Sequence, residues 1–407
     1  MKLTTKLLAA TAIVSATGAS ATDLEVTHWW TSGGEAAAVA ELAKAFDASG
    51  DHWIDGAIAG SGGTARPIMI SRITGGDPMG ATQFNHGQQA LELVEAGLML
   101  DLTDVAEENN WEEVIFPKSL LDACTVDGRV YCAPVNIHSP EWLWISNKVY
   151  EDLGLPVPQN WNEFVESAPA VREAGKVPLA LGNQPWQAST AFGAIQVAVA
   201  GLENWQAVNM EQDLDVAAGD AYAAVFEAAA AARELAVGSN VQDWNQATNL
   251  VITDQAAGQI MGDWAQGEFA VAGEVAGEDY TCLPGLGLNA YLSTGGDAFY
   301  FPKLDDPEKE AAQKRLAALL VSPEVQVAFN LKKGSLPIRG DVDLSEANDC
   351  MQKGLELLAS GNVMPSGDML WTPDTQKQVE DLMVEFWMSD MPAAEAHERW
   401  VDILSMD

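Results

Sequence analysis

The stretch that most constrains this chain runs from Leu24 to Phe46, where a strand, two tryptophans, a glycine turn and a helix follow one another. Apolar and polar residues alternate up to His28, which is typical of a strand. The helix is indicated by an apolar face at helical spacing, made of Val39, Leu42, Ala43 and Phe46. A strand that leads directly into a helix in this way predicts an α/β fold.

Trp29 and Trp30 stand at the carboxyl end of the predicted strand, beside the start of the helix. Successive side chains of a strand point to opposite faces, so both rings cannot pack into one core. Ligands of open α/β sheets bind at the carboxyl ends of strands. We therefore expect at least one ring to face a cleft, with Glu35 on the first helical turn as an acceptor.

The N-terminus has the pattern of a cleaved secretory signal. Lys2 and Lys6 precede the apolar run from Leu7 to Val14, and Ala19-Ser20-Ala21 is a small-x-small cleavage site. The run is too short to span a bilayer. We expect residues 1–21 to be removed and the remaining chain to be exported to the periplasm.

The net charge of the 407-residue chain is −38. Such an acidic surface repels phosphate backbones, which argues against nucleic acid as a partner. The acidic residues are dispersed along the sequence and form no acidic tail, so we interpret them as a general surface property. No sequence feature indicates oligomerisation, and a monomer is expected.

Four cysteines in an oxidising compartment predict disulfides, with three possible pairings. Cys124 and Cys132 flank a segment with Asp127-Gly128, a strong hairpin turn, so we pair them across the hairpin. Cys282 and Cys350 are then paired by default. No CxxC spacing occurs and the histidines are scattered, so neither a metal site nor a cofactor is expected.

The remaining sequence predicts two α/β lobes. The chain is expected to cross from one lobe to the other three times. Strand and helix patterns alternate up to about residue 102, which indicates a parallel sheet with covering helices. Residues 187–275 are mostly helical, and residues 289–301 return as strand. We predict an N-terminal lobe of residues 22–133 plus 295–341 and a C-terminal lobe of residues 134–294 plus 342–407.

Fourteen tryptophans suggest a sugar site, because the CH faces of sugars stack on aromatic rings and their hydroxyls need donors and acceptors. A single tryptophan is more often a core residue than a ligand platform. Here, however, suitable residues gather at predicted strand ends and turns: Trp29, Trp30, Glu35, Asn85, His86, Asn136, Gln184, Trp186, Asp263, Trp264, Asp297 and Lys333.

Several segments together resemble the glucose-binding branch of the sugar-binding proteins of bacterial ABC importers. They are HWWTSGGEAAAV, DGAIAGSGG, APVNIHSPEWLW, NQPW, MGDWAQGEF, GEDYTC and LKKGSLPIR. The similarity runs over about residues 24–388. It implies the two-lobe fold of periplasmic binding proteins, with a multi-strand hinge, closing around one monosaccharide.

The resemblance also implies which residues contact the sugar. The tryptophan pair of that branch falls on Trp29 and Trp30, and its helix-start glutamate on Glu35. Its polar residue after the third strand falls on His86, with Asn85 as the other register. The further matches are Trp264, Asp297 and Lys333. The histidine of its C-terminal loop is absent here, and Asp368 would substitute for it.

We therefore expect a periplasmic receptor that captures glucose or a related hexose by hinge closure and delivers it to a membrane permease. One alternative is a disaccharide or another small polar solute as cargo. A secreted glycosidase is a further alternative, with Glu35 and Asp297 as its two carboxylates. Neither HExxH nor GxSxG is present, so we do not expect an enzyme.

Overall fold

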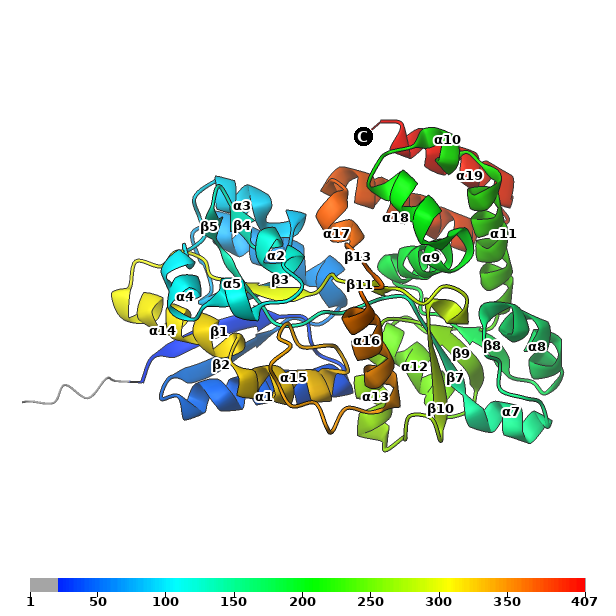
Figure 1. The fold of residues 1–407 in the computed structure, drawn as a ribbon, viewed down its shortest axis with the longest axis horizontal. Coiled ribbons are helices and arrows are strands. Elements are labelled where there is room, and N and C mark those ends of the chain that lie inside the picture. Colours follow the sequence, from blue (N-terminus) through cyan, green and yellow to red (C-terminus); the bar gives the residue numbers. More distant parts are fainter. Residues whose placement is uncertain (1–20, 407) are drawn as a thin grey trace, which may run out of the picture.

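The fold is described from a computed structural model over residues 21–406, except for the side chain of Asp368. Residues 1–20 of the predicted signal peptide lie outside the described part of the chain. Within residues 21–406, no helix combines the length and the apolar character that crossing a bilayer requires. The elements gather around two separate sheets, which form two lobes side by side (Figure 1).

The first lobe is built on a five-stranded sheet with the order β2-β1-β3-β12-β6. β1 pairs in parallel with β2 and β3, whereas β12 runs antiparallel to β3 and β6. Its strands are β1 (Asp23–His28), β2 (His52–Ala57), β3 (Ala81–Asn85), β6 (Cys132–Pro134) and β12 (Asp297–Tyr300). The late strand β12 thus returns beside β3, as predicted for residues 289–301.

Helices cover both faces of this sheet. α1, α14 and α15 pack against one another and against the sheet, while α2 contacts β3. The predicted apolar face of α1 is buried at Val39, Leu42 and Phe46. The remaining elements of this lobe are α1 (Gly33–Ala48), α2 (Ser61–Thr74), η1 (Gln88–Ala90), α3 (Leu91–Glu95), α4 (Thr103–Glu108), α5 (Trp111–Val114), α6 (Ser119–Ala123), the hairpin strands β4 (Thr125–Val126) and β5 (Arg129–Val130), α14 (Pro307–Leu320) and α15 (Pro323–Lys333).

The second lobe has a smaller sheet, with the order β10-β7-β9-β8. Its strands are β7 (Trp142–Ser146), β8 (Val177–Ala180), β9 (Ala256–Ile260) and β10 (Tyr280–Pro284). A separate parallel pair of short strands, β11 (Leu292–Ser293) and β13 (Val363–Met364), lies beside the hinge.

This lobe is mostly helical, as the sequence predicted. The C-terminal helices α18 and α19 pack on α9 and α11, and the buried face of α18 includes Val379, Leu382, Met383 and Phe386. The helices are α7 (Asn147–Leu153), α8 (Trp161–Glu173), α9 (Pro185–Asn209), α10 (Leu214–Ala217), α11 (Asp220–Leu235), α12 (Trp244–Ile252), α13 (Ala265–Ala272), η2 (Gly285–Gly287), α16 (Asp349–Ser360), α17 (Gly367–Leu370), α18 (Pro373–Met388) and α19 (Ala393–Leu404).

Three chain crossings lie side by side and join the lobes. The backbone N–H of His138 on the first crossing donates to Gly295 O on the second at 3.0 Å. Ile137 exchanges two backbone hydrogen bonds with Leu336 on the third. Gly296 permits this close approach, because a Cβ there would overlap the carbonyl oxygen of Asn136. The predicted multi-strand hinge is therefore confirmed.

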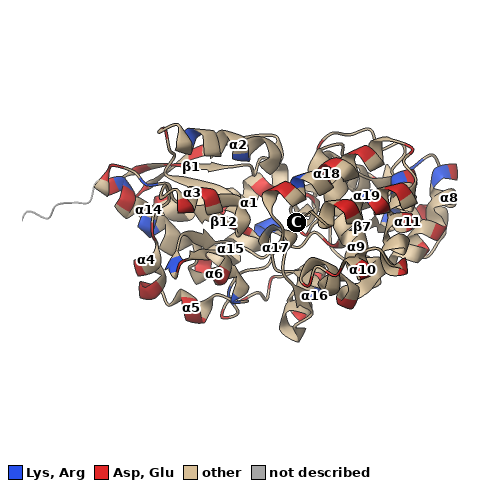
Figure 2. Cartoon of the chain, turned by 90° about the horizontal axis from the view of Figure 1, so that it is seen from above, with Lys and Arg blue, Asp and Glu red and all other residues tan. Residues whose placement is uncertain are grey.

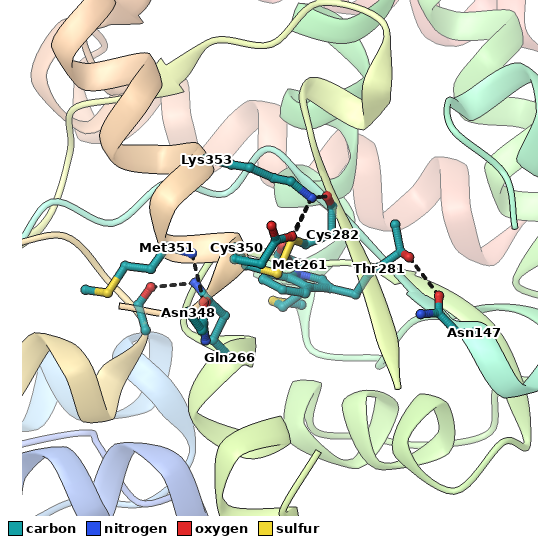
Figure 3. Close-up of a disulfide and its surroundings, with 12 residues drawn as sticks. Asn147, Met261, Gln266, Thr281, Cys282, Asn348, Cys350, Met351 and Lys353 are labelled. Carbon is teal, nitrogen blue, oxygen red and sulfur yellow. Dashed lines mark hydrogen bonds and ion pairs between the residues drawn. A yellow bond between two sulfur atoms is a disulfide. The ribbon is translucent and has the colours of Figure 1, made fainter. Parts of the chain in front are cut away.

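The structure contains both predicted disulfides, Cys124–Cys132 and Cys282–Cys350. The first joins the end of α6 to β6 across the β4–β5 hairpin. The second joins β10 to α16 within the second lobe (Figure 3). Each bridge lies within one lobe, so neither ties the two lobes together.

Some boundaries differ from those predicted. The glycines at residues 60–64 predict a tight turn that leads into a helix from about Arg66, but α2 begins at Ser61, directly after its N-cap Gly60. The strand predicted over residues 289–301 is divided into β11 and β12 by the hinge segment 294–296. Acidic residues are spread over both lobes (Figure 2), in agreement with their dispersion in the sequence.

Candidate functional site

A cavity of about 570 Å³ lies between the two lobes. The first lobe contributes residues from the β1–α1 turn and the start of α2, the second from α9, the starts of α12 and α13, and α18. The hinge crossings form part of the same wall. The cavity lining includes Trp29, Glu35, Asn85, His138, Glu141, Trp186, Trp264, Asp297 and Lys333.

The two adjacent tryptophans take different roles, as strand geometry requires. Trp29 is half-buried and its ring lines the cavity. Trp30 is only 1% exposed and packs against Phe299 and Phe329 in the core, although it also borders the cavity. Trp29 therefore offers the more accessible ring, and Trp30 mainly supports the wall behind it.

Glu35 and Lys333 form a buried ion pair in the cavity wall. Ser32 caps α1 and places Glu35 on its first turn, while Lys333 is the last residue of α15. Lys333 Nζ lies 3.1 Å from Glu35 Oε1, and Ser32 Oγ donates to Glu35 Oε2 at 3.1 Å. The ammonium group also lies over the rings of Trp30 and Trp264, a favourable position for a cation.

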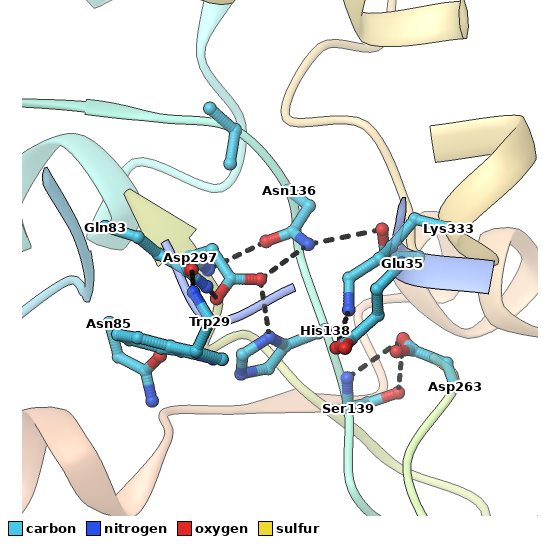
Figure 4. A network of polar contacts seen from close by, with 12 residues as sticks. Trp29, Glu35, Gln83, Asn85, Asn136, His138, Ser139, Asp263, Asp297 and Lys333 are labelled. Atoms are coloured by element: carbon cyan, nitrogen blue, oxygen red, sulfur yellow. Dashed lines mark hydrogen bonds and ion pairs between the residues drawn. The ribbon is translucent and has the colours of Figure 1, made fainter. Parts of the chain in front are cut away.

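Asp297, the first residue of β12, is the centre of a buried polar network (Figure 4). Gln83 Nε2 donates to its Oδ1 at 2.6 Å. Its Oδ2 accepts from Asn136 Nδ2 at 3.0 Å and from His138 Nδ1 at 3.2 Å. Gln83 also accepts from the backbone N–H of Trp29 at 2.9 Å, so the network fixes the strand end that carries the tryptophan.

The charges of this network stabilise one another. Burial by itself would raise the pKa of Asp297, but the attraction of His138 outweighs it and holds that pKa below its usual range. Burial would likewise lower the pKa of His138, yet the neighbouring Asp297 carboxylate raises it. Below the ordinary histidine pKa of about 6.5, the pair is therefore an ionised carboxylate and a cationic imidazole in the cavity wall.

The second lobe supplies two more half-buried indoles, Trp186 on the first turn of α9 and Trp264 before α13. Their ring centroids lie 6.3 Å apart, and the Trp264 ring lies edge-on to His138 at 5.3 Å. Asp263 faces the hinge, where its Oδ2 accepts from Ser139 N at 2.9 Å. Burial raises the pKa of Asp263 to about 7.

The structure places His86 outside the cavity wall. It is buried beside the hinge, where its backbone N–H donates to Gly296 O at 3.2 Å, and burial lowers its pKa to about 3. Asn85, the alternative register, ends β3 opposite Asp297 and lines the cavity. Asp368 lies in α17, which contacts η1 across the cleft, but its side chain is outside the described part.

Comparison with known proteins agrees with this architecture. The family model of the bacterial extracellular solute-binding proteins matches residues 30–327. A "probable sugar-binding periplasmic protein" of Rhizobium meliloti is 35% identical over 363 residues, which cover 88% of this chain and 86% of the relative. The chain belongs to the bacterial extracellular solute-binding proteins.

A further relative agrees with this assignment, and two solved structures share the fold. A solute-binding protein of Brucella melitensis, also named a probable sugar-binding periplasmic protein, is 35% identical over 84% of this chain and 80% of its own length. Among solved structures, a chitin oligosaccharide binding protein superposes with a TM-score of 0.76 at 18% identity, covering 95% of this chain and 98% of its own. Maltose-bound MalE3 of T. maritima gives a TM-score of 0.75 at 18% identity, over 95% and 100%. These two structures show the shared two-lobe fold.

Glu35 and Asp297 of this solute-binding protein are poorly suited to act as the carboxyl pair of a glycosidase. Glycoside hydrolysis needs one carboxyl group that holds its proton to act as the acid. Asp297 has a lowered pKa and accepts hydrogen bonds from three side chains. Glu35 is held by Lys333 and Ser32. The two carboxylates first considered as a catalytic pair thus serve to organise the wall.

The predicted site residues did not include Gln83, His138 and Glu141, which belong to the polar network or the wall of this solute-binding protein. Gln83 gave a signal, because it is a polar residue in the middle of a buried central strand. His138 follows closely after the predicted lobe boundary at residues 133 and 134, and this position indicated that it lies near the cleft. Glu141 follows Pro140 directly before β7, and no local pattern marks it.

Proposed function

We propose that this protein is the sugar-binding component of an ABC importer, located in the periplasm. It captures one monosaccharide, glucose or a related hexose, and delivers it to the membrane permease. The observation that carries the proposal is the cavity between two hinged lobes, in which three indole rings surround two buried ion pairs. Aromatic faces and fixed polar groups of this kind suit a pyranose, which has CH faces and many hydroxyls.

In this proposal each lobe provides part of the sugar's contacts. Trp29 stacks on the ring from the first lobe, while Trp264 and Trp186 contact it from the second. Asp297 and Glu35 accept from hydroxyls, and Lys333 and Asn85 donate. A sugar that touches both lobes binds the closed form better than the open form, so it shifts the population towards closure.

The names of the most similar relatives support a sugar as cargo, and both the Rhizobium and the Brucella proteins are described as periplasmic. The cavity volume favours a second candidate as well. At about 570 Å³ it lies within the ~300–1,000 Å³ typical of drug-sized ligands, which leaves room for a disaccharide. The polar wall of α9 beyond Trp186 would then receive the second ring.

A thermal-shift screen of the protein without its signal segment tests the proposal. The panel contains D-glucose, D-galactose, D-mannose, D-xylose, maltose and cellobiose. A cognate ligand at about 100 times its Kd stabilises the folded state by about 2.7 kcal/mol, which raises the melting temperature by several degrees. A shift with a hexose supports the proposal, and a shift with disaccharides alone favours the second candidate. Recovery of the bound sugar unchanged distinguishes binding from turnover.

A further inference from the structure

Glu141 is a buried carboxyl group on the cavity wall that the sequence did not single out. It lies directly before β7, where the first hinge crossing enters the second lobe, and it is 4% exposed. Its Oε2 accepts one hydrogen bond, from the backbone N–H of Ser293 at 3.3 Å. The only other donor among the described residues is the backbone N–H of Glu141 itself, so the carboxyl group retains hydrogen-bonding capacity towards the cavity.

An ionised carboxylate is energetically unfavourable in this position. Burial removes the water that would solvate the charge, and the long hydrogen bond from Ser293 replaces little of that solvation. Burial accordingly raises the pKa of Glu141 to about 8. The charged groups that face it are Asp263, which raises the pKa further, and His138, which lowers it. At neutral pH Glu141 therefore holds its proton.

Two ion pairs near the hinge end of the cavity balance their own charges. Lys333 is matched by Glu35 and His138 by Asp297. A protonated Glu141 adds no charge to this balanced set, so a neutral ligand fits this end of the cavity better than an ion does.

We propose that Glu141, as an uncharged carboxylic acid, binds a hydroxyl group of the ligand at the hinge end of the cavity and makes the site selective for neutral sugars. This inference rests on the proposed sugar-binding function. The acid can donate its proton to one ligand oxygen and accept from another, whereas a carboxylate can only accept. Closure of the lobes excludes water from the group and strengthens the preference for the neutral form.

A pH dependence of affinity follows, with a definite sign. The bound state favours the protonated acid, so the affinity is constant below the pKa of about 8 and falls as the pH rises above it. Above that pH the loss approaches about tenfold per pH unit, because the proton must be taken up before the sugar can bind.

The test uses calorimetric titration with whichever of D-glucose, D-galactose or D-mannose binds wild type most tightly. Wild type, Glu141→Gln and Glu141→Leu are titrated with this hexose at about pH 7 and about pH 9.5. D-glucosamine is titrated at about pH 7 only, where most of its amine is protonated and the sugar is a cation. Glu278→Gln makes the same change on an exposed loop and serves as the matched control. Near-ultraviolet circular dichroism checks that each variant is folded.

The amide of Glu141→Gln keeps a donor and an acceptor but does not titrate. We expect its affinity at neutral pH to lie within about threefold of wild type and to stay flat at alkaline pH, whereas Glu141→Leu loses about tenfold or more. D-glucosamine should bind wild type at least about tenfold more weakly than the matching neutral hexose. Wild-type affinity in Glu141→Leu, a wild-type affinity that stays flat at alkaline pH, or tighter binding of D-glucosamine would each overturn the inference while leaving sugar binding intact. If wild type bound no sugar at all, the proposed function would fail and the inference with it.

Discussion

His138 Nδ1 lies 3.2 Å from Asp297 Oδ2, and this contact joins the first hinge crossing to the strand that returns on the second. The two residues are 159 positions apart in the sequence. Their ionised pair supports the wall of the cavity and the geometry of the hinge together. Its state of charge should therefore be visible in the stability of the whole protein.

We predict that Asp297→Asn lowers the free energy of unfolding by about 3 kcal/mol near pH 6, because it leaves the buried His138 without its counter-ion. The pKa of Asp297 is lowered, so its contribution is present above the unfolded value of about 4 and is lost as the pH falls below it. The pKa of His138 is raised, so its contribution is complete below about pH 6.5 and is lost as the pH rises above that value.

Urea denaturation of wild type and Asp297→Asn across this pH range measures the difference. It should be largest between about pH 4 and pH 6.5 and shrink on both sides. Asp55→Asn is the matched control, since Asp55 also contacts a histidine, His28, but its side chain is 61% exposed. Asp55→Asn should lower the free energy of unfolding by less than about 1 kcal/mol. A difference for Asp297→Asn that is constant with pH would argue against the ionised pair.

The adjacent tryptophans provide a second prediction. Trp30→Ala should lower the stability by about 3–5 kcal/mol, because the ring is buried against Phe299 and Phe329. Trp29→Ala should cost about 1 kcal/mol or less, since the ring is half-buried, yet weaken hexose binding at least about tenfold. Denaturation and calorimetry on both variants distinguish the two roles. If both variants lost the same free energy of unfolding, the assignment of different roles to Trp29 and Trp30 would be wrong.

A third prediction concerns the contact between the lobes at the start of α1. Gly34 N donates to Glu268 Oε1 of α13 at 2.6 Å, and a Cβ at Gly34 would overlap the backbone of Gly267. Gly34→Ala must therefore push the two helix starts apart, which should weaken sugar affinity about tenfold or more through a changed closed form. Gly33→Ala is the control, because its Cβ would meet Glu268 at an ordinary 3.5 Å. Small-angle scattering with and without sugar measures closure. If Gly34→Ala and Gly33→Ala had the same sugar affinity and closed to the same extent, the prediction would be wrong.

The disulfides provide a fourth prediction. Cys282–Cys350 closes a sequence separation of 68 residues and Cys124–Cys132 one of 8. In the chain-entropy account the longer loop stabilises more, by roughly 4 kcal/mol against roughly 2.5 kcal/mol. Replacing each pair by alanine should lower stability in that order. Since the cysteines lie outside the cavity wall, sugar affinity should change less than about threefold. A large loss of affinity in either variant would show that the bridge positions the site.

Much of the fold was predictable because its signals are local. The strand, tryptophan pair and helix of residues 24–46 follow from periodicity, and the hairpin from Asp127-Gly128. The start of α2 was missed because Gly62 and Gly63 suggested a turn, although the structure accommodates them in a helix. There the contacts of the folded chain override the intrinsic preference of glycine.

The site was harder to predict because its contacts are long-range. The cluster around Asp297 joins Gln83 on β3 to Asn136 and His138 on the first crossing, and nothing in the local sequence connects these segments. The choice between Asn85 and His86 depended on a shift of one residue, which reverses the face of a strand. Glu141 became apparent only when its burial and its place on the cavity wall were known.

The most direct test of the central claim is a calorimetric titration of the wild-type protein with the best hexose of the panel, repeated with Trp29→Ala. The account predicts one sugar bound per chain, recovered unchanged, with at least about tenfold weaker binding in Trp29→Ala. Absence of binding for every hexose, or the same affinity in the variant, would contradict it.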